Sequence, residues 1–193
     1  MELIKYSTLN EEPWKNGLGT TRQIVIWPLA ADLSNFEWRV SAAAIIFPGS
    51  FSHYPGVSRS LSVLSGKSAE LKLGEAQKTL AYQGPVVTFD GGDHAEVLSA
   101  DGPVLDYNVM SRDEAVSHEL ACVTLKNGEV YNRKGDFTLI TVFEGCELIF
   151  EGDVVPLAQY DSVLFKERDG VDIVLTGQAE KDVCMLVTEV TKK

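Results

Sequence analysis

The sequence predicts an all-β fold made of two similar, jelly-roll-like β-barrel halves, and two observations support this prediction. The first is a succession of short apolar or alternating runs, such as QIVIW, RSLSVL and FTLITVF, separated by Gly, Pro, Asp and Asn about every eight to twelve residues. This spacing is typical of β-sandwiches and barrels. Only residues 29–36 and 111–121 have helical patterns, and both segments are short enough to be connectors.

The second observation is an internal repeat. LSVLSG at 61–66 resembles ITVFEG at 140–145, VTF at 87–89 resembles VLF at 163–165, and VLS at 97–99 resembles VLT at 174–176. The three offsets, 79, 76 and 77 residues, differ only by small gaps. Short β patterns match by chance, but three matches in one common order predict a duplicated unit.

Each repeat has the order strand, glycine turn, strand, loop, strand, turn and strand, with FDGGD at 89–93 and FKERDG at 165–170 in the last turn. This is the layout of a cupin barrel, which is a jelly-roll architecture, and two such halves make a bicupin. We expect the first half, with the N-terminal strands and a pocket, at 1–110, a connector at 111–121 and the second half at 122–193.

Composition and charge argue against several classes of protein. The formal net charge of -11 disfavours nucleic-acid binding, which depends on clustered Lys and Arg. No apolar run approaches the roughly 18 residues of a membrane span, and the N-terminal pattern is not that of a signal peptide, so we expect a cytoplasmic protein without membrane contact. The three cysteines have no C-x-x-C spacing and predict buried, reduced thiols rather than a disulfide framework or a zinc site.

The histidines disfavour a metal site. Many catalytic cupins bind a divalent metal through two histidines one residue apart, a carboxylate and a third histidine. This chain has three histidines, none of them in such a pair. We expect His94 and His118 to be solvated, and we expect no metal and no cofactor. His53 stands where a cupin places its first ligands, so it could hydrogen-bond a ligand or titrate near neutral pH, or it could be purely structural.

Arginines are concentrated where acidic residues are sparse. Residues 1–60 carry five basic and five acidic groups, so the whole net negative charge belongs to the rest of the chain. Arg22, Arg39 and Arg59 could therefore form a selective anion pocket, since a guanidinium binds a carboxylate through two parallel hydrogen bonds. An inward Arg39 needs either such a ligand or an ion pair with Asp106, and the residues alone leave both alternatives open.

The segment PWKNGLGTTRQ at 13–23 predicts a turn followed by one wall of this pocket. Its glycines permit the turn, and Asn16 and the threonines can hydrogen-bond locally. Thr20 and Arg22 share one face of the strand that follows, because side chains alternate along a strand. Trp14 is expected to pack the loop down. The segment lacks the Gly-Lys-Ser/Thr ending of a phosphate loop.

Four segments resemble the HutD/Ves family, which is linked by its genomic setting to bacterial histidine utilisation. They are PWKNGLGTTRQI at 13–24, WRVSAAAI at 38–45, FPGSFSHYPGVSRSLSVLSG at 47–66 and DYNVMSR at 106–112. The chain departs from the family pattern at Leu18, Gln23 and Ser58, where Gly, Glu and an acidic residue are usual. The resemblance implies a metal-independent bicupin that binds a small acidic molecule such as formylglutamate, formiminoglutamate or urocanate. It implies no enzymatic activity.

The expected function is therefore non-catalytic binding of a small carboxylate by the first half, with a regulatory role in histidine catabolism. Two alternatives stay open: a metal-independent cupin enzyme acting on a small acidic metabolite, and an interaction module whose acidic second half binds a basic partner. The chain could also form a homodimer. No catalytic residue is assigned, and the candidate ligand-binding residues are Asn16, Thr20, Arg22, Arg39, Ser41, His53, Arg59 and Asn108.

Overall fold

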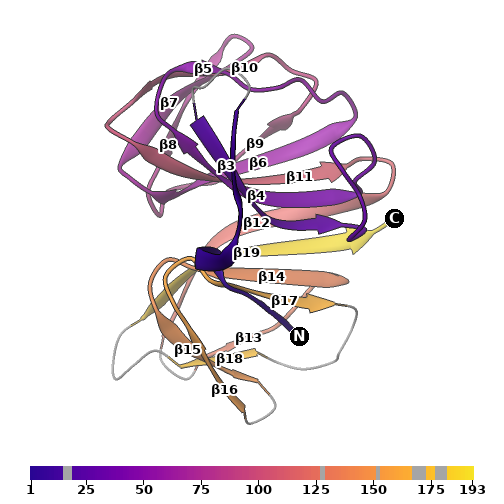
Figure 1. Cartoon of the computed structure of the whole chain (residues 1–193), viewed down its shortest axis with the longest axis vertical. Helices are drawn as coiled ribbons and strands as arrows, with labels where there is room; N and C mark the ends of the chain where they lie inside the picture. Colours follow the sequence, from indigo (N-terminus) through magenta and orange to yellow (C-terminus); the bar gives the residue numbers. More distant parts are fainter. Residues whose placement is uncertain (15–18, 127–128, 151–152, 167–172, 177–181) are drawn as a thin grey trace. The chain divides into compact units, whose positions relative to one another are not determined.

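A computed structural model describes residues 1–14, 19–126, 129–150, 153–166, 173–176 and 182–193 (Figure 1). Apart from turns, loops and one 3-10 helix, η1 (Tyr6–Thr8), these residues form strands. The strands are β1 (Glu2–Ile4), β2 (Glu11–Pro13), β3 (Gly19–Trp27), β4 (Trp38–Ile45), β5 (Gly49–Ser50), β6 (Val57–Ser65), β7 (Ser68–Leu73), β8 (Ala76–Ala81), β9 (Val87–Asp90), β10 (Ala95–Ala100), β11 (Val104–Arg112), β12 (Val116–Leu125), β13 (Val130–Tyr131), β14 (Phe137–Val142), β15 (Cys146–Phe150), β16 (Asp153–Leu157), β17 (Ser162–Lys166), β18 (Ile173–Thr176) and β19 (Val183–Lys192). Over these ranges no helix has the length and apolar character that crossing a membrane requires.

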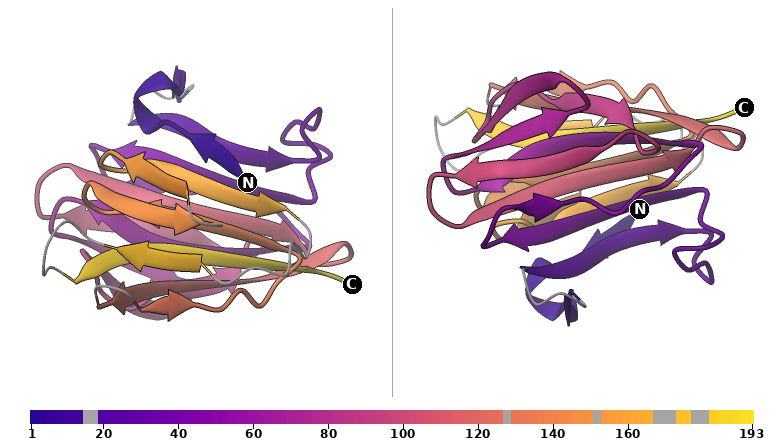
Figure 2. Two further views of the ribbon diagram at one scale, coloured as in Figure 1. Left: turned by 90° about the horizontal axis from the view of Figure 1, so that it is seen from below. Right: turned by 90° about the horizontal axis from the view of Figure 1, so that it is seen from above.

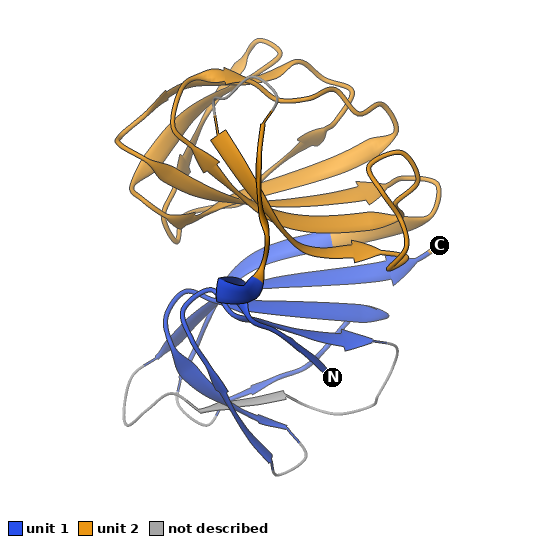
Figure 3. Cartoon of the chain, viewed as in Figure 1, with its two compact units in different colours: residues 1–8, 119–192 blue, residues 9–118, 193 orange. Residues whose placement is uncertain are grey.

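The chain divides into two compact units, which are coloured separately in Figure 3. Unit 1 comprises residues 1–8 and 119–192, and unit 2 comprises residues 9–118 together with Lys193. The division differs from the expected halves in two ways. The N-terminal strand β1 belongs to unit 1, where it pairs with β17. There is also no separate connector, because the boundary between the units falls within β12.

Each unit is a sandwich of two antiparallel sheets. Unit 2 has a six-stranded sheet in the order β2-β3-β4-β11-β6-β9 and a four-stranded sheet in the order β5-β10-β7-β8 (Figure 1). Unit 1 has a five-stranded sheet in the order β1-β17-β14-β19-β12 and a four-stranded sheet in the order β13-β18-β15-β16. Figure 2 shows from two further directions how the strands of a sheet run alongside one another.

The strand orders confirm the predicted duplication. The series β9-β6-β11-β4 of unit 2 corresponds to β17-β14-β19-β12 of unit 1, and β5-β10-β7-β8 corresponds to β13-β18-β15-β16. The repeated sequence pieces lie on equivalent strands, since the first pair begins in β6 and β14, the second lies in β9 and β17, and the third in β10 and β18. The two sheets of each unit are separate ladders, so each unit is a jelly-roll-like sandwich rather than one closed barrel sheet.

The register of the six-stranded sheet decides which side chains face the interior of unit 2. Residues paired across antiparallel strands point to the same face. Leu61 of β6 pairs with Asn108 of β11, which pairs in turn with Ser41 of β4. Leu61 also belongs to the core cluster that contains Leu71 and Val97 of the four-stranded sheet. The face that carries Leu61 is therefore the inner face of unit 2, and the other two residues lie on it.

Neither segment with a helical pattern forms a helix. Residues 29–36 form turns, which the side chains of Asp32 and Asn35 stabilise. The Asp32 carboxylate accepts hydrogen bonds from the backbone N–H and the hydroxyl of Ser34, and Asn35 Oδ1 accepts one from the Asp32 backbone N–H. Short polar side chains that bond to the local backbone in this way compete with helix formation.

The second of these segments contains the start of β12 instead. In this strand buried Val116 and Leu120 alternate with exposed residues. That period of two is the signal of a strand, and it was present in the sequence. The charged residues that precede Val116 form the turn that joins β11 to β12.

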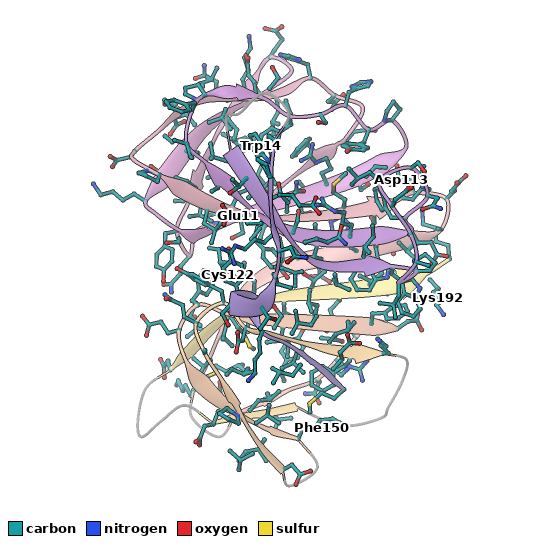
Figure 4. All side chains as sticks on the ribbon, viewed as in Figure 1. Glu11, Trp14, Asp113, Cys122, Phe150 and Lys192 are labelled. Carbon is teal, nitrogen blue, oxygen red and sulfur yellow. The ribbon has the colours of Figure 1, made fainter. Side chains whose placement is uncertain are left out.

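Trp14, which follows β2, is hydrogen-bonded to the start of β3 (Trp14 is labelled in Figure 4). The Trp14 backbone N–H donates to the Gly19 carbonyl at 2.9 Å, and its indole N–H donates to Thr21 Oγ1 at 2.7 Å. A Cβ at Gly19 would lie 2.3 Å from the Ala44 carbonyl oxygen, so the close approach of the two strands requires glycine there. The indole thus lies against β3.

Candidate functional site

Five polar residues gather on the inner face of unit 2. Arg39 and Ser41 come from β4, Arg59 from β6, and Asp106 and Asn108 from β11, and the strand register places all five on this face. We call them the inner polar cluster. Four are buried, whereas Arg39 is half-buried. Buried polar groups are normally hydrogen-bonded, so the partners of each member decide what the cluster can bind.

Two aromatic rings and a backbone carbonyl hold the Arg59 guanidinium. Its Cζ lies 4.9 Å from the centroid of the Phe51 ring and 5.2 Å from that of Phe89, and its Nη1 donates to the Ser52 carbonyl at 3.2 Å. The buried Nε has no hydrogen-bond partner among the described residues. Burial lowers the pKa of Arg59 to about 10. At neutral pH the group is therefore a cation whose buried Nε–H has no partner in the described part of the chain.

The Asp106 carboxyl is buried near this cation. Oδ1 accepts a hydrogen bond from the Ala43 backbone N–H at 2.9 Å, but Oδ2 has no partner in the described part of the chain. Burial raises the pKa of Asp106 to about 7, against the opposing effects of the Ala43 hydrogen bond and the charges of Arg59 and Arg39. Near neutral pH the carboxyl thus exists both as an acceptor and, when protonated, as an O–H donor.

Arg39 lies at the half-exposed end of the cluster. Its Nε donates to Gln23 Oε1 and its Nη1 to Ser41 Oγ, both at 3.1 Å. Burial lowers the pKa of Arg39. The ion pair that the sequence left open is not formed, because the salt bridges within the described ranges join neither Arg39 nor Arg59 to Asp106.

Three buried atoms of the cluster consequently lack a partner among the described residues: Arg59 Nε, Asp106 Oδ2 and Asn108 Oδ1. The first is a donor, the second is a donor or an acceptor according to its protonation, and the third is an acceptor. A small molecule that carries a carboxylate and an N–H group has the complementary set.

Thr20 and Arg22, predicted to line the site, lie on the opposite face of the sheet. Arg22 lies one position before Gln23, and it is Gln23 that pairs with Ser41 on the inner face. The Arg22 guanidinium instead forms an ion pair with Glu11 at 2.7 Å. A register shift just after Gln23 reverses which residues of β3 face inward, and it is not visible as a pattern in the sequence.

Of the remaining residues near the site, His53 was predicted and Tyr54 was not. His53 is exposed, and Asn16 lies outside the described residues. The prediction missed Tyr54, which lies within electrostatic reach of both Arg39 and Arg59. Tyr54 follows His53 directly, and an aromatic residue beside a candidate ligand residue could have drawn attention to it.

His118 is not the solvated histidine that the sequence predicted. Its Nδ1 lies 2.6 Å from Ser111 Oγ, and its Nε2 lies 2.9 Å from Ser60 Oγ, which is in turn 2.9 Å from Thr88 Oγ1. Burial lowers the pKa of His118 to about 4, so the ring is neutral and bridges strands. His94 is exposed as expected. Where the structure describes the chain, no three His, Cys, Asp or Glu side chains are placed to hold a metal ion.

In unit 1 both oxygens of a buried carboxylate on the inner face accept hydrogen bonds. Glu189 of β19 is buried, and its Oε1 accepts hydrogen bonds from the Tyr131 hydroxyl at 2.9 Å and the Lys134 backbone N–H at 3.2 Å. Its Oε2 accepts from the Gly135 backbone N–H at 3.0 Å and the Thr138 hydroxyl at 2.7 Å. These four bonds close a self-contained network that leaves no carboxylate oxygen for a ligand.

The two units differ most at the positions of the unpartnered atoms. Matching the strand registers of the repeats places Met185 and Val187 at the positions of Asp106 and Asn108. Both are buried in the apolar core cluster of unit 1. The same sandwich thus folds with apolar residues at these positions in one unit and with polar residues in the other.

Known proteins resemble this chain in sequence. The sequence pattern of the HutD family matches residues 6–185. Protein Ves of Citrobacter koseri is 36% identical over 114 residues, which cover 56% of this chain and 58% of that protein. The matched region therefore spans less than two thirds of the length of this curated relative.

Solved structures resemble the chain over nearly its full length. A conserved protein of unknown function from Pseudomonas aeruginosa PAO1 superimposes with a TM-score of 0.87 at 21% identity, and HutD from Pseudomonas fluorescens SBW25, in a formate condition, with 0.82 at 25% identity; each comparison covers 100% of this chain and 98% of the other. A cupin 2 conserved barrel domain protein from Leptotrichia buccalis gives 0.65 at 10% identity, covering 98% and 96%. The last likeness shows that the fold is cupin-like.

Proposed function

The chain belongs to the HutD family, and from this premise we propose that the inner polar cluster of unit 2 binds the carboxylate of a small acidic metabolite without catalysing a reaction. The ligand would be of the type of formylglutamate, formiminoglutamate or urocanate. Its binding would adjust histidine catabolism in the cytoplasm.

The observation that carries this proposal is the set of three unpartnered polar atoms, Arg59 Nε, Asp106 Oδ2 and Asn108 Oδ1. Each such atom costs about 1–3 kcal/mol in a protein interior, so stability alone favours apolar residues at these positions. Unit 1 has apolar residues at the positions of Asp106 and Asn108, and a hydrogen-bonded threonine, Thr138, at that of Arg59. Polar groups that converge within an apolar core at a cost in stability are typical of a ligand site.

The chemistry of the three atoms suits this class of ligand. Arg59 Nε–H can donate to one oxygen of a carboxylate, and a protonated Asp106 can donate to the other. Asn108 Oδ1 can accept from an N–H, a group that formylglutamate, formiminoglutamate and urocanate all carry in addition to a carboxylate. Arg39 adds a second positive charge at the half-exposed end, in a chain whose net charge of -11 repels anions elsewhere.

Replacing Arg59 with alanine is expected to weaken the binding of such a ligand by about 10- to 100-fold. A hydrogen bond to a charged group contributes about 1.5–3 kcal/mol, which corresponds to this range. Titration calorimetry with formylglutamate, formiminoglutamate, urocanate and glutamate measures the effect, and mass spectrometry of the same mixtures is expected to show no turnover.

Arg22→Ala is the matched control, because it removes an arginine from the opposite face of the same sheet, where it is paired with Glu11. Its ligand affinity is expected to equal that of the unmodified chain. The proposal fails if none of the four compounds binds at millimolar concentration, or if the two arginine variants lose affinity equally.

Carboxylate affinity is also expected to fall as the pH rises above about 7. Burial raises the pKa of Asp106 to about 7, and an anion bound beside this group favours its protonated form. Above that pH each binding event has to take up a proton, so affinity falls by up to about tenfold per pH unit. Calorimetry in buffers of different ionisation enthalpy measures the proton uptake, and Asp106→Asn is expected to abolish it.

A further inference from the structure

Two cysteines of unit 1 lie together. Cys122 of β12, labelled in Figure 4, and Cys184 of β19 come from neighbouring strands of the five-stranded sheet. Their Sγ atoms are 3.7 Å apart, and both residues are half-buried, free thiols. We propose that this pair is a redox-reactive dithiol, which a peroxide oxidises to an intramolecular disulfide.

The geometry requires only a local movement. A disulfide joins sulfurs about 2.05 Å apart from residues whose Cα atoms are about 4.4–6.8 Å apart. Cys122 and Cys184 lie on neighbouring strands, and neighbouring strands are about 4.7–4.9 Å apart. Rotation of the two side chains can bring the sulfurs from 3.7 Å to bonding distance. Cys146 is buried in the core cluster of unit 1 and belongs to β15 of the other sheet, which leaves it outside the pair.

Cys184 is expected to react first. The Thr124 hydroxyl that donates to Cys184 Sγ at 3.7 Å is exposed, so a small peroxide can approach this sulfur. Burial, together with the neighbouring Cys184 sulfur, raises the pKa of Cys122 to about 12. Cys122 therefore keeps its proton and serves as the second, resolving thiol.

The oxidation proceeds in two balanced steps. The Cys184 thiolate attacks one oxygen of hydrogen peroxide and the O–O bond breaks; a sulfenic acid forms on Cys184, and the departing hydroxide becomes water with the proton that the thiol released. Cys122 Sγ then attacks Cys184 Sγ, the S–O bond breaks, and the second hydroxide takes the Cys122 proton. Two thiols are oxidised to one disulfide, and one peroxide is reduced to two waters.

The bond would join positions separated by 62 residues in the sequence. It would also attach β12, the end strand of the five-stranded sheet, covalently to β19. A cross-link of this length restricts the unfolded chain, so oxidation is expected to raise the melting temperature of the protein.

Peptide mapping after treatment of the folded chain with hydrogen peroxide tests the proposal. Trypsin places the three cysteines in separate peptides, 113–126, 135–166 and 182–192. We expect non-reducing mass spectrometry to show 113–126 linked to 182–192 and lighter than the sum of the two peptides by two hydrogen atoms. The denatured, oxidised chain is expected to retain one titratable thiol of three, and a reductant should restore the others.

Single variants separate this pair from general thiol oxidation. Cys146→Ser is the matched control and should form the same linkage as fast as the unmodified chain. Cys122→Ser should form none, and dimedone should label Cys184 in it as a sulfenic acid. A linkage that includes Cys146, a disulfide found only between two chains, or three thiols surviving peroxide treatment would each overturn the proposal.

Discussion

The free energy of unfolding of the Asp106→Asn variant, taken relative to that of the unmodified chain, is expected to rise by about 4 kcal/mol as the pH increases from about 4 to about 8. Burial raises the pKa of Asp106 from 3.8 to about 7, and this difference corresponds to about 4 kcal/mol at 1.36 kcal/mol per pKa unit. The folded state binds the proton more tightly than the unfolded state. Protonated Asp106 therefore stabilises the unmodified chain fully below the pKa of the unfolded state, and this stabilisation is lost as the pH rises through the pKa of the folded state.

Asparagine removes this ionisation while its side-chain oxygen can still accept the Ala43 N–H bond. Urea unfolding of both chains across the pH range measures the difference, and the comparison cancels the other titrating groups, His118 included. Asp101→Asn is the matched control, because the Asp101 side chain is 62% exposed beside Lys67. A difference between Asp106→Asn and the unmodified chain that stays constant with pH would show that burial does not hold this carboxyl protonated.

Replacing Glu189 with alanine is expected to lower the free energy of unfolding by about 2–5 kcal/mol, because each buried donor that loses its acceptor costs about 1–3 kcal/mol. The carboxylate accepts four hydrogen bonds, two of them from the backbone N–H groups of Lys134 and Gly135. Alanine leaves the buried Gly135 N–H unpaired and removes the acceptor of the part-buried Lys134 N–H and of the Tyr131 and Thr138 hydroxyls. Urea unfolding at neutral pH measures the loss as a lower midpoint.

Two variants make the Glu189 result specific. Glu189→Gln retains one acceptor oxygen and is expected to lose less stability than the alanine variant. Glu144→Ala removes an exposed glutamate of the same unit and is expected to change the free energy of unfolding by no more than about 0.5 kcal/mol. A loss in Glu189→Ala no larger than in Glu144→Ala would contradict the stabilising role of the network.

The fold could be predicted from the sequence because the patterns that indicate strands and turns are local and periodic. Apolar alternation marks strands, and glycine and aspartate mark the turns between them. The repeat between 61–66 and 140–145, with its two companions, predicted the correspondence of β6, β9 and β10 with β14, β17 and β18 that the strand orders show. Residues 111–121 were predicted wrongly because acidic residues at a turn resemble the first turn of a helix.

Only some of the residues of the candidate site could be placed from the sequence. Strand alternation correctly placed Arg39 with Ser41, and Asp106 with Asn108, on common faces, because such pairs are two residues apart on one strand. It could not say which face is the inner one. That depends on which side chains contact the second sheet, and those contacts involve Leu71 and residues equally distant in the sequence.

By itself, the sequence determined the all-β class, the duplication and the family, since each rests on the kinds of residues and their spacing along the chain. Only the tertiary structure decided which polar residues meet. The register shift after Gln23 turns Arg22 to the opposite face of the sheet from Arg39, because a shift of one residue reverses the side chains of a strand. Asp106 is also buried without an ion pair to any residue that the structure describes. The polar character of the site was thus encoded locally, but its members were selected by strand pairing between distant segments.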